Sequence, residues 1–550
     1  MSLAKNMITS PSDLLWQRRK EKLMQGPSER ELERVFGFNT FRTGQKEIIT
    51  NVLAGRNVLA VLPTGTGKTL CYQYPARFLP GITVIVSPLL SLMEDQVQQL
   101  KGMGEKGAAA LNSHVSYEDR QRILDSLNDR SLLFLSPEML QNKMVLERLK
   151  KVRTGLFAVD EAHCISQWGH EFRTDYLKLA QVRRALGNPP CLALTATATK
   201  KVQSDIITHL DLENVRQSVY SVDRPNISLH VKKADSWEEK EDILFTALKS
   251  HPKPGIVFTA TRAEAEKLAV KIRNKCGLKT VSYHGGMEKE DRLLVQQQFL
   301  SDETDVVCCT NAFGMGINKP NVAFVIHYHL PQSPEHYLQE TGRAGRGGDP
   351  ASALLLYQSE DRQLPLSMIS SELPDDNELS LLYERLLQIR NSGEPAPLTK
   401  DAVKTCTAEE TKQRLLCFYL EQAGTAGSDG RIRLGELDGN WKEQLQLKFQ
   451  MRKREKEAQF LEVERIVNSR NSCFRNAFLS YFGEESTSSP DRCCTNCGHE
   501  FEAYPAVNKD IYNHSYKKPA GGWDDMLRTI LHQKKQTGEA VSVEQAGTDH

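Results

Sequence analysis

A glycine-rich turn at residues 63–69, with the sequence PTGTGKT, has the composition of a phosphate-binding loop. It follows an apolar run at 58–62 that is typical of a buried strand, and it opens a segment expected to be helical. Glycines let backbone N–H groups turn toward phosphate oxygens, Lys68 would reach the β- and γ-phosphates, and the Thr69 hydroxyl would bind Mg²⁺. The turn therefore predicts a nucleotide site formed by Thr64, Gly65, Thr66, Gly67, Lys68 and Thr69.

An acidic pair, Asp160 and Glu161, directly follows a second apolar run at 156–159. Phosphoryl transfer needs a carboxylate that holds Mg²⁺ and a group that orients the attacking water. We assign Asp160 to the metal and Glu161 to the water. On a surface helix such a pair is usually only solvated charge, but its position at the end of a strand, downstream of a phosphate loop, favours catalysis.

The size and composition of the chain indicate a multidomain globular protein. It has 550 residues, of which 39% are hydrophobic and 26% charged, so roughly three or four domains can each bury a core. The net charge of +1 provides no overall field that would attract nucleic acid, so any basic surface must be local. The N-terminus lacks the apolar core of a secretory signal, and proline and glycine interrupt the longest apolar run, at 78–93. We expect a cytoplasmic protein without a membrane partner.

Short apolar runs alternate with helix-length segments, a pattern that predicts buried strands in parallel sheets. The runs form two sets, which implies an α/β fold with two parallel-sheet domains that join near residues 221–225. In such sheets ligands bind at the carboxyl ends of the strands, where the phosphate loop and the acidic pair would both lie. The expected strands are 58–62, 83–86, 132–135, 156–159 and 192–194 in the first set, and 256–258, 280–283, 306–309, 324–327 and 353–356 in the second.

From about residue 363 the strand-like runs stop, and the pattern predicts helices at 379–389, 413–422 and 441–471. Residues 398–437 fit either a winged-helix-like element or plain helical packing. The predicted segments are an N-terminal extension at 1–26, a first domain at 27–222, a second domain at 223–362, a mainly helical, cysteine-bearing module at 363–500 and a poorly ordered tail at 501–550.

The run from Cys164 to Arg173, CISQWGHEFR, resembles the aromatic-rich loop of the RecQ family of superfamily 2 DNA helicases. In that family the loop couples DNA contact to ATP hydrolysis, and Trp168 and Phe172 would stack on bases while Arg173 meets phosphate. A core position for Trp168 is the alternative, although its glycine and histidine neighbours favour a loop. The resemblance assigns DNA binding and coupling to Gln167, Trp168, His170, Phe172 and Arg173. It also implies that the two α/β domains are RecA-like.

Other segments match the same family in the expected order across residues 31–362. Phe38, Arg42 and Gln45 resemble its adenine-recognition motif. In that motif Gln45 would read the edge of the base, with Phe38 and Arg42 flanking it. The turns that contact the DNA backbone have counterparts at 87–89 and 136–138.

The sequence GRAGR at 342–346 resembles the sixth motif of the family. An arginine of this motif reaches the γ-phosphate from the second domain when the cleft between the domains closes. Its charge stabilises the transition state, so hydrolysis occurs only in the closed state. The resemblance implies Arg346 as this arginine finger, with Arg343 as the second choice.

Four cysteines lie close together near residues 473–497, and this segment resembles the zinc module of the family. Zinc takes four soft ligands in a tetrahedron, and Cys494 and Cys497 form a Cys-x-x-Cys pair that supplies two of them. Cys473 supplies the third ligand. Because Cys493 is adjacent to Cys494, the fourth is either Cys493 or His499, and four metal-free cysteines remain the alternative. A closed site of this kind would be structural.

The resemblance implies an ATP-dependent DNA helicase that uses ATP and Mg²⁺ to move 3′-to-5′ on single-stranded DNA and to unwind duplex DNA in recombination and repair. It implies a short form, because the 50 residues after Glu500 are too few for the C-terminal helical nucleic-acid-binding domain of many members. Two alternatives stay open: an RNA helicase of the same superfamily, and a nucleic-acid binding or annealing protein without enzyme activity. Single-stranded-DNA-binding and repair proteins are the expected protein partners, at the nucleoid if the source is bacterial.

Overall fold

The computed structural model describes residues 26–112, 115–166, 173–313, 319–392, 395–427, 430–433, 440–469, 472–485 and 490–501. The predicted N-terminal extension and tail therefore fall almost entirely outside the described residues. Within the described ranges, no helix has the length and apolar character needed to cross a bilayer.

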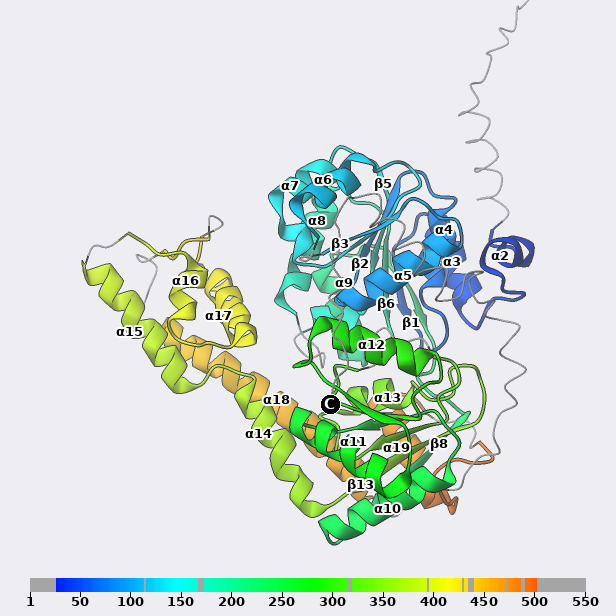
Figure 1. Ribbon diagram of the computed structural model, residues 1–550. Helices are drawn as coiled ribbons and strands as arrows, with labels where there is room; N and C mark the ends of the chain where they lie inside the picture. Colours follow the sequence, from blue (N-terminus) through cyan, green and yellow to red (C-terminus); the bar gives the residue numbers. More distant parts are fainter. Residues whose placement is uncertain are drawn as a thin grey trace, which may run out of the picture.

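The first α/β domain is built on a seven-stranded sheet in the order β3-β4-β2-β5-β6-β1-β7. Every neighbouring pair of strands is parallel, so the connecting helices cover the faces of the sheet (Figure 1). The inner strands are apolar and buried, as the sequence VLAV of β1 illustrates. The strands are β1 (Val58–Val61), β2 (Ile82–Val86), β3 (Ala108–Leu111), β4 (Leu132–Leu135), β5 (Thr154–Val159), β6 (Cys191–Thr195) and β7 (Arg216–Val219).

Side-chain caps fix where several helices of this domain begin. The Ser28 hydroxyl accepts from the backbone N–H of Glu31, and the Thr199 hydroxyl accepts from that of Val202. Such caps satisfy N–H groups that have no partner within the helix. The helices are α2 (Glu29–Phe36), α3 (Gln45–Leu53), α4 (Leu70–Ala76), α5 (Leu90–Gly102), α6 (Tyr117–Asp125), α7 (Lys143–Leu149), α8 (Leu179–Ala185) and α9 (Lys200–His209), with short 3-10 helices η1 (Met139–Gln141), η2 (Ala162–Ile165) and η3 (Thr174–Lys178).

The second α/β domain carries a six-stranded parallel sheet in the order β10-β11-β9-β12-β13-β8. Its strands are β8 (Ile227–Lys233), β9 (Gly255–Phe258), β10 (Thr280–Tyr283), β11 (Val306–Cys309), β12 (Phe324–His327) and β13 (Ala351–Tyr357). Its helices are α10 (Trp237–Ser250), α11 (Arg262–Cys276), α12 (Lys289–Leu300), α13 (Pro334–Thr341) and η4 (Ser359–Arg362). The two domains lie one above the other in Figure 1.

The remaining elements are helical, and the long helix α18 belongs to two cores. Its first half packs Trp441 and Phe449 against α15 to α17, in a helical unit at residues 373–449 that projects to the left in Figure 1. Its second half packs Phe460 and Ile466 into the core of the second α/β domain. The elements are α14 (Gln363–Ser371), α15 (Asp376–Ser392), α16 (Thr399–Lys404), α17 (Glu410–Gln422), α18 (Trp441–Asn468), α19 (Phe474–Tyr481) and η6 (Thr495–Cys497).

The helical unit also contacts the first α/β domain. Lys178 pairs with Glu421 at 2.8 Å and Arg414 with Glu138 at 3.8 Å, and the Leu177 side chain packs against the core of the unit. Within the unit, isolated antiparallel bridges join residue 398 to 431 and 426 to 432 beside α16 and α17. The described residues of the segment at 398–437 therefore hold strand pairing as well as helices.

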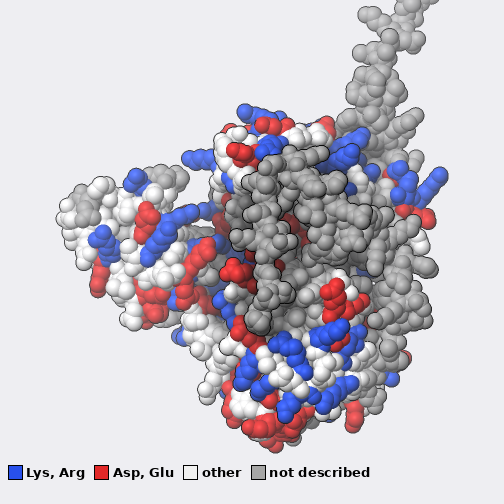
Figure 2. Space-filling model, viewed as in Figure 1, with Lys and Arg blue, Asp and Glu red and all other residues white. Residues whose placement is uncertain are grey.

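The predicted fold class is confirmed: two parallel-sheet domains precede a mainly helical region. All ten expected strands are present with their ends shifted by at most two residues, and the structure adds β3, β7 and β8. Positive and negative side chains are interspersed on the face shown in Figure 2, consistent with a net charge of +1.

Candidate nucleotide cleft and metal centre

The phosphate loop at residues 63–69 lies between β1 and α4, at the carboxyl edge of the first sheet. Gly65 and Gly67 have φ angles of +85° and +76°, in the left-handed region that favours glycine. A Cβ atom at Gly67 would also lie 2.8 Å from the Gln45 amide nitrogen. Both glycines are therefore needed for the shape of the loop.

Gln45 holds this loop in place. Its amide oxygen accepts from the backbone N–H of Arg42 at 2.8 Å, and its amide nitrogen donates to two carbonyl groups of the loop at 2.8 and 3.0 Å. Arg42 donates to the Gly65 carbonyl, and the Phe38 side chain is 50% exposed. Gln45 and Arg42 of the predicted adenine group thus contact the phosphate loop directly.

Asp160 and Glu161 follow β5 directly, and only β6 separates β5 from β1 in the sheet. Burial raises the pKa of the Asp160 carboxyl to about 7, the charge of Glu161 also raises it, and Lys68 opposes the shift. A buried carboxylate of this kind gains stability from a cation, which suits a metal ligand. The predicted Mg²⁺ ligand and the predicted phosphate ligand are therefore close enough to interact.

Hydrogen bonds connect the acidic segment to the end of the neighbouring strand β6. His163 Nδ1 lies 2.9 Å from the Thr195 hydroxyl, which donates to the Thr197 carbonyl at 3.0 Å. All three side chains are buried. These bonds link the segment that follows the acidic pair to the turn that follows β6.

Four of the residues predicted to couple DNA binding to hydrolysis, Gln167, Trp168, His170 and Phe172, lie outside the described residues. Arg173 is described, and its guanidinium donates to the Pro88 carbonyl at 3.0 Å. Tyr176, at the next turn of the chain, donates to the Asp160 carbonyl at 3.1 Å. The end of the predicted coupling loop thus contacts a predicted DNA-backbone turn, and η3, which follows the loop, contacts the acidic pair.

The arginine turn at residues 342–346 follows α13 and meets the phosphate loop across the domain boundary. The Thr64 hydroxyl donates to the Gly342 carbonyl at 3.1 Å. A Cβ atom at Gly65 would lie only 3.4 Å from the Cγ atom of Arg346. The two domains are therefore in direct contact at the nucleotide cleft.

This cleft holds an excess of positive charge. Burial lowers the pKa of Arg346 to about 9, and the charges of Arg343 and Arg224 lower it as well, whereas Glu161 raises it. Burial and the neighbouring Arg42 lower the pKa of Arg224 to about 10. These arginines stay charged at neutral pH, so an anionic ligand such as a polyphosphate would relieve their repulsion.

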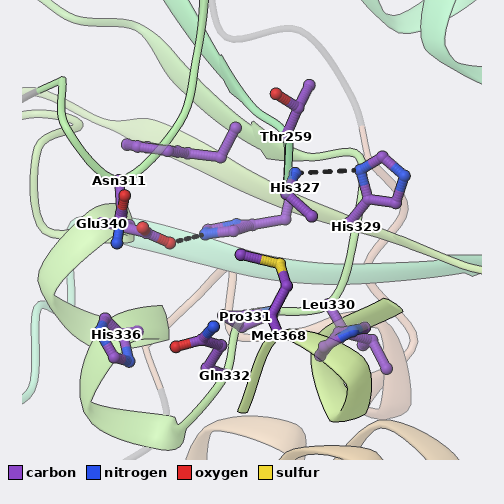
Figure 3. Close-up of a pocket in the computed structure, with 13 residues that line it drawn as sticks. Thr259, Asn311, His327, His329, Leu330, Pro331, Gln332, His336, Glu340 and Met368 are labelled. Carbon is purple, nitrogen blue, oxygen red and sulfur yellow. Dashed lines mark hydrogen bonds and ion pairs between the residues drawn. The ribbon is translucent and has the colours of Figure 1, made fainter. Parts of the chain in front are cut away.

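A pocket lined by both polar and apolar side chains opens at the carboxyl ends of β11, β9 and β12, bordered by α13 and α14 (Figure 3). His327 Nε2 lies 2.8 Å from a Glu340 oxygen, and His329 Nδ1 accepts from the backbone N–H of Ala260 at 3.3 Å. Burial lowers the pKa of His329 to about 3, so this ring is neutral at physiological pH. Sequence analysis did not predict the pocket, because its walls come from five separate elements.

Cys473, Cys493, Cys494 and Cys497 come together with all four sulfur atoms within 4.8 Å of one another. Sulfur separations are 3.5 Å for Cys473–Cys493, 3.8 Å for Cys473–Cys494 and 3.5 Å for Cys494–Cys497. A tetrahedral zinc site with Zn–S bonds of about 2.3 Å has sulfur atoms about 3.8 Å apart, whereas a disulfide needs about 2.05 Å. These thiols fit zinc. In the described part of the chain the group that could hold a metal contains Cys493 but not His499.

Replacing Cys494 by serine is expected to remove stoichiometric zinc, because a neutral hydroxyl replaces one of four thiolates in a closed site. Elemental analysis of the purified protein should find about one zinc per chain in the parent and well below half of that in the variant. Cys276→Ser, outside the cluster and partly exposed, is the matched control and should keep its zinc. Full zinc content in Cys494→Ser would rule out this cysteine as a ligand.

Two parallel-sheet domains, with a phosphate loop in one and an arginine turn that meets it from the other, define a RecA-like two-domain helicase. Residues 42–205 match the DEAD/DEAH box helicase family, and residues 239–348 match the helicase conserved C-terminal domain. Among solved structures, Mycobacterium smegmatis helicase Lhr bound to ssDNA and AMP-PNP has a similar fold. Its TM-score is 0.52 at 20% identity, over 72% of this chain and 58% of that one.

Residues 441–498 match the RecQ zinc-binding family. The probable ATP-dependent DNA helicase RecS of Bacillus subtilis is 41% identical over 507 residues, which cover 92% of this chain and 97% of RecS. The ATP-dependent DNA helicase RecQ of Haemophilus influenzae is 43% identical over 332 residues, 60% of this chain and 53% of that RecQ. The chain belongs to the RecQ family of ATP-dependent DNA helicases, as its motifs indicated.

Proposed function

We propose that this chain is an ATP-dependent helicase that moves 3′-to-5′ on single-stranded DNA and unwinds duplex DNA in recombination and repair. The observation that carries the proposal is the contact between Thr64 and Gly342. It brings the arginine turn of the second domain to the phosphate loop of the first, as a hydrolysis step that depends on domain closure requires. The 3′-to-5′ direction rests on family membership alone.

The residues of the cleft have distinct proposed roles. Lys68 binds the β- and γ-phosphates, and Thr69 and Asp160 hold Mg²⁺. Glu161 orients the attacking water. Arg346 stabilises the charge that develops on the γ-phosphate, and its neighbours support this choice: it approaches the phosphate loop and interacts with Glu161. The other candidate, Arg343, is 6% exposed and lies near the end of β11, where its charge lowers the pKa of the buried Cys309 thiol against the larger effect of burial.

Adenine is proposed to bind beside the phosphate loop. The exposed Phe38 ring provides a stacking surface and Arg42 lies next to the loop. Gln45 would contact the edge of the base through the second lone pair of its amide oxygen, because its amide nitrogen is bonded to the loop.

Single-stranded DNA is proposed to cross the carboxyl edges of both sheets. On the first domain the supporting features are Arg173 and the turn at 87–89 to which it is bonded. On the second domain they are the polar groups of the pocket in Figure 3. DNA binding is proposed to be coupled to the acidic pair, which Tyr176 contacts. The residues proposed for this coupling are Gln167, Trp168, His170 and Phe172.

Zinc is proposed to be held by Cys473, Cys493, Cys494 and Cys497 and to stabilise the fold of the module. We further propose that the protein acts with single-stranded-DNA-binding and repair proteins in the cytoplasm, at the nucleoid in a bacterial cell. The proposed functional segments are 27–222 and 223–362 for the two RecA-like domains and 363–500 for the zinc-bearing module, flanked by 1–26 and 501–550.

The decisive experiment measures ATP hydrolysis under three conditions: without nucleic acid, with single-stranded DNA, and with single-stranded RNA of the same sequence. We expect DNA to stimulate the kcat at least about tenfold and RNA to have little effect. Equal stimulation by RNA would favour an RNA helicase, and no hydrolysis under any condition would favour a binding or annealing protein. Duplexes with either a 3′ or a 5′ single-stranded tail then test direction: preferential unwinding from the 5′ tail would contradict the proposed polarity.

A further inference from the structure

The segment at residues 221–226 lies between β7 and β8 and joins the two α/β domains, and we call it the hinge. Its Arg224 guanidinium reaches both sides of the nucleotide cleft. One terminal nitrogen donates to the Thr64 carbonyl at 2.7 Å and to the Gly342 carbonyl at 3.2 Å. The other donates to the Gly345 carbonyl at 2.7 Å and to the Ala344 carbonyl at 3.3 Å. One hinge side chain thus bonds the phosphate loop and the arginine turn together.

Asn226 supports the same turn from the second domain. Its amide nitrogen donates to the Gly345 carbonyl at 2.9 Å and to the Asp349 carbonyl at 2.7 Å. A Cβ atom at Gly345 would lie 2.5 Å from this nitrogen, so the turn is packed closely against the hinge. The position of Arg346 relative to the phosphate loop is therefore fixed by hinge side chains as well as by α13.

The cysteine-bearing module is hydrogen-bonded to the hinge through Glu484 and Arg475. The Glu484 carboxylate accepts from the backbone N–H of Val222 at 2.9 Å and from the Ser221 hydroxyl. Arg475, on α19 and only 2% exposed, donates to the Asp223 carboxylate. It also donates to the Arg224 carbonyl at 3.1 Å and to the Ile227 carbonyl. These bonds fix the backbone on both sides of Arg224.

The same helix, α19, is bonded to α13, which leads into the arginine turn. The Phe478 ring stacks on Tyr337 with a centroid distance of 4.4 Å and an interplanar angle of 19°. The Tyr481 hydroxyl donates to the Glu335 carboxylate at 2.8 Å. Hinge, α13 and α19 thus form one packed body on the second domain, and Arg224 extends from this body to the phosphate loop.

We propose that Arg224 is a positioning residue that sets the arginine turn against the phosphate loop when the cleft closes. In this proposal the cysteine-bearing module clamps the hinge and so holds Arg224 in place. The inference rests on the proposed function, because its effect appears in ATP hydrolysis. Across the cleft Arg224 donates only to main-chain carbonyl groups, those of Thr64, Gly342, Ala344 and Gly345. The two terminal nitrogens of a guanidinium can serve these acceptors together, whereas the single nitrogen of lysine cannot.

Arg224→Gln tests the first half of the proposal through steady-state hydrolysis with single-stranded DNA and through binding of a fluorescent ATP analogue with Mg²⁺. We expect kcat to fall about 30-fold or more while nucleotide affinity changes less than about threefold, because the residue acts on the closed state. Arg224→Lys should recover only part of the loss. Arg216→Gln, on the exposed surface of the adjacent strand β7, is the matched control and should behave as the parent.

Glu484→Ala tests the clamp, alone and in the Arg224→Gln background. We expect the single variant to lower kcat about fivefold with unchanged zinc content, and to cause no further loss when Arg224 is already replaced. Independent, multiplying effects would overturn the clamp, and a parent-like kcat in Arg224→Gln would overturn the positioning role. A parent protein that does not hydrolyse ATP with DNA would instead overturn the proposed function itself.

Discussion

Replacing Arg346 with glutamine is expected to lower the kcat of DNA-stimulated ATP hydrolysis about 1,000-fold, the scale of an arginine finger. The guanidinium meets the phosphate loop only where the two domains touch, so its charge acts on the transition state more than on bound ATP. Affinity for a fluorescent ATP analogue with Mg²⁺ should therefore stay within about threefold of the parent. Stopped-flow binding and steady-state hydrolysis, measured on the same preparation, separate these two effects.

Two further variants make the result specific. Arg362→Gln removes an exposed arginine that pairs with Glu464 at 3.5 Å outside the cleft, and it should leave hydrolysis unchanged. Arg343→Gln removes the second finger candidate. If Arg343→Gln lost far more activity than Arg346→Gln, the finger would have to be reassigned to Arg343.

Replacing Gly342 with alanine is expected to lower kcat about 30-fold by keeping the cleft from closing fully. Gly342 has φ −62° and ψ −2°, which alanine adopts without backbone strain. Its Cβ atom, however, would lie 1.9 Å from the Thr64 hydroxyl oxygen and 2.9 Å from the Leu338 carbonyl oxygen. The contact with Thr64 crosses the domain boundary, so the added methyl group mainly disturbs the approach of the two domains rather than the local fold.

The measurements for this variant are the kcat for ATP hydrolysis and the melting temperature. Gly102→Ala is the control, because a Cβ atom at Gly102 meets nothing within 4 Å. We expect Gly342→Ala to keep a melting temperature within a few degrees of the parent and to lose turnover, which would separate blocked closure from unfolding. Parent-like turnover in Gly342→Ala would mean that hydrolysis does not require this close approach.

The central strands of both sheets were predictable, whereas most edge strands were not. β3 and β7 form the two edges of the first sheet, and β8 forms one edge of the second. In β7 only Ser218 is buried, and β8 ends in three residues that are at least partly exposed. In β7 and β8, a strand with a neighbour on one side only carries polar side chains and loses the continuous apolar run that identifies a buried parallel strand. β3 is apolar, with the sequence AAAL, but alanine has a low preference for strands.

Local sequence was sufficient to select the candidate residues of the phosphate loop and the acidic pair, and family resemblance added those of the cysteine cluster. The candidate side chains of the loop and of the acidic pair stand within a short segment or directly after an apolar strand, so spacing predicts their position. Cys473 lies 20 residues before Cys493, and its place in the cluster followed from the resemblance to the RecQ family. The Cys-x-x-Cys pair is the local part of the cluster, because its geometry is set by the backbone between Cys494 and Cys497. The choice of Cys493 over His499 in the metal-binding group depended on how the chain packs around them.

Only the tertiary structure revealed how the two halves of the motor are joined. Arg224 was visible at the domain boundary, but its partners Thr64 and Gly342 lie more than 100 residues away in opposite directions along the chain. Arg475 likewise meets the hinge over a separation of 252 residues. The acceptors are mostly main-chain carbonyl groups, which every residue possesses, so no residue type in the sequence marks them. Local chemistry could be read from side-chain identity and spacing, whereas these contacts arise from the packing of elements distant in the chain.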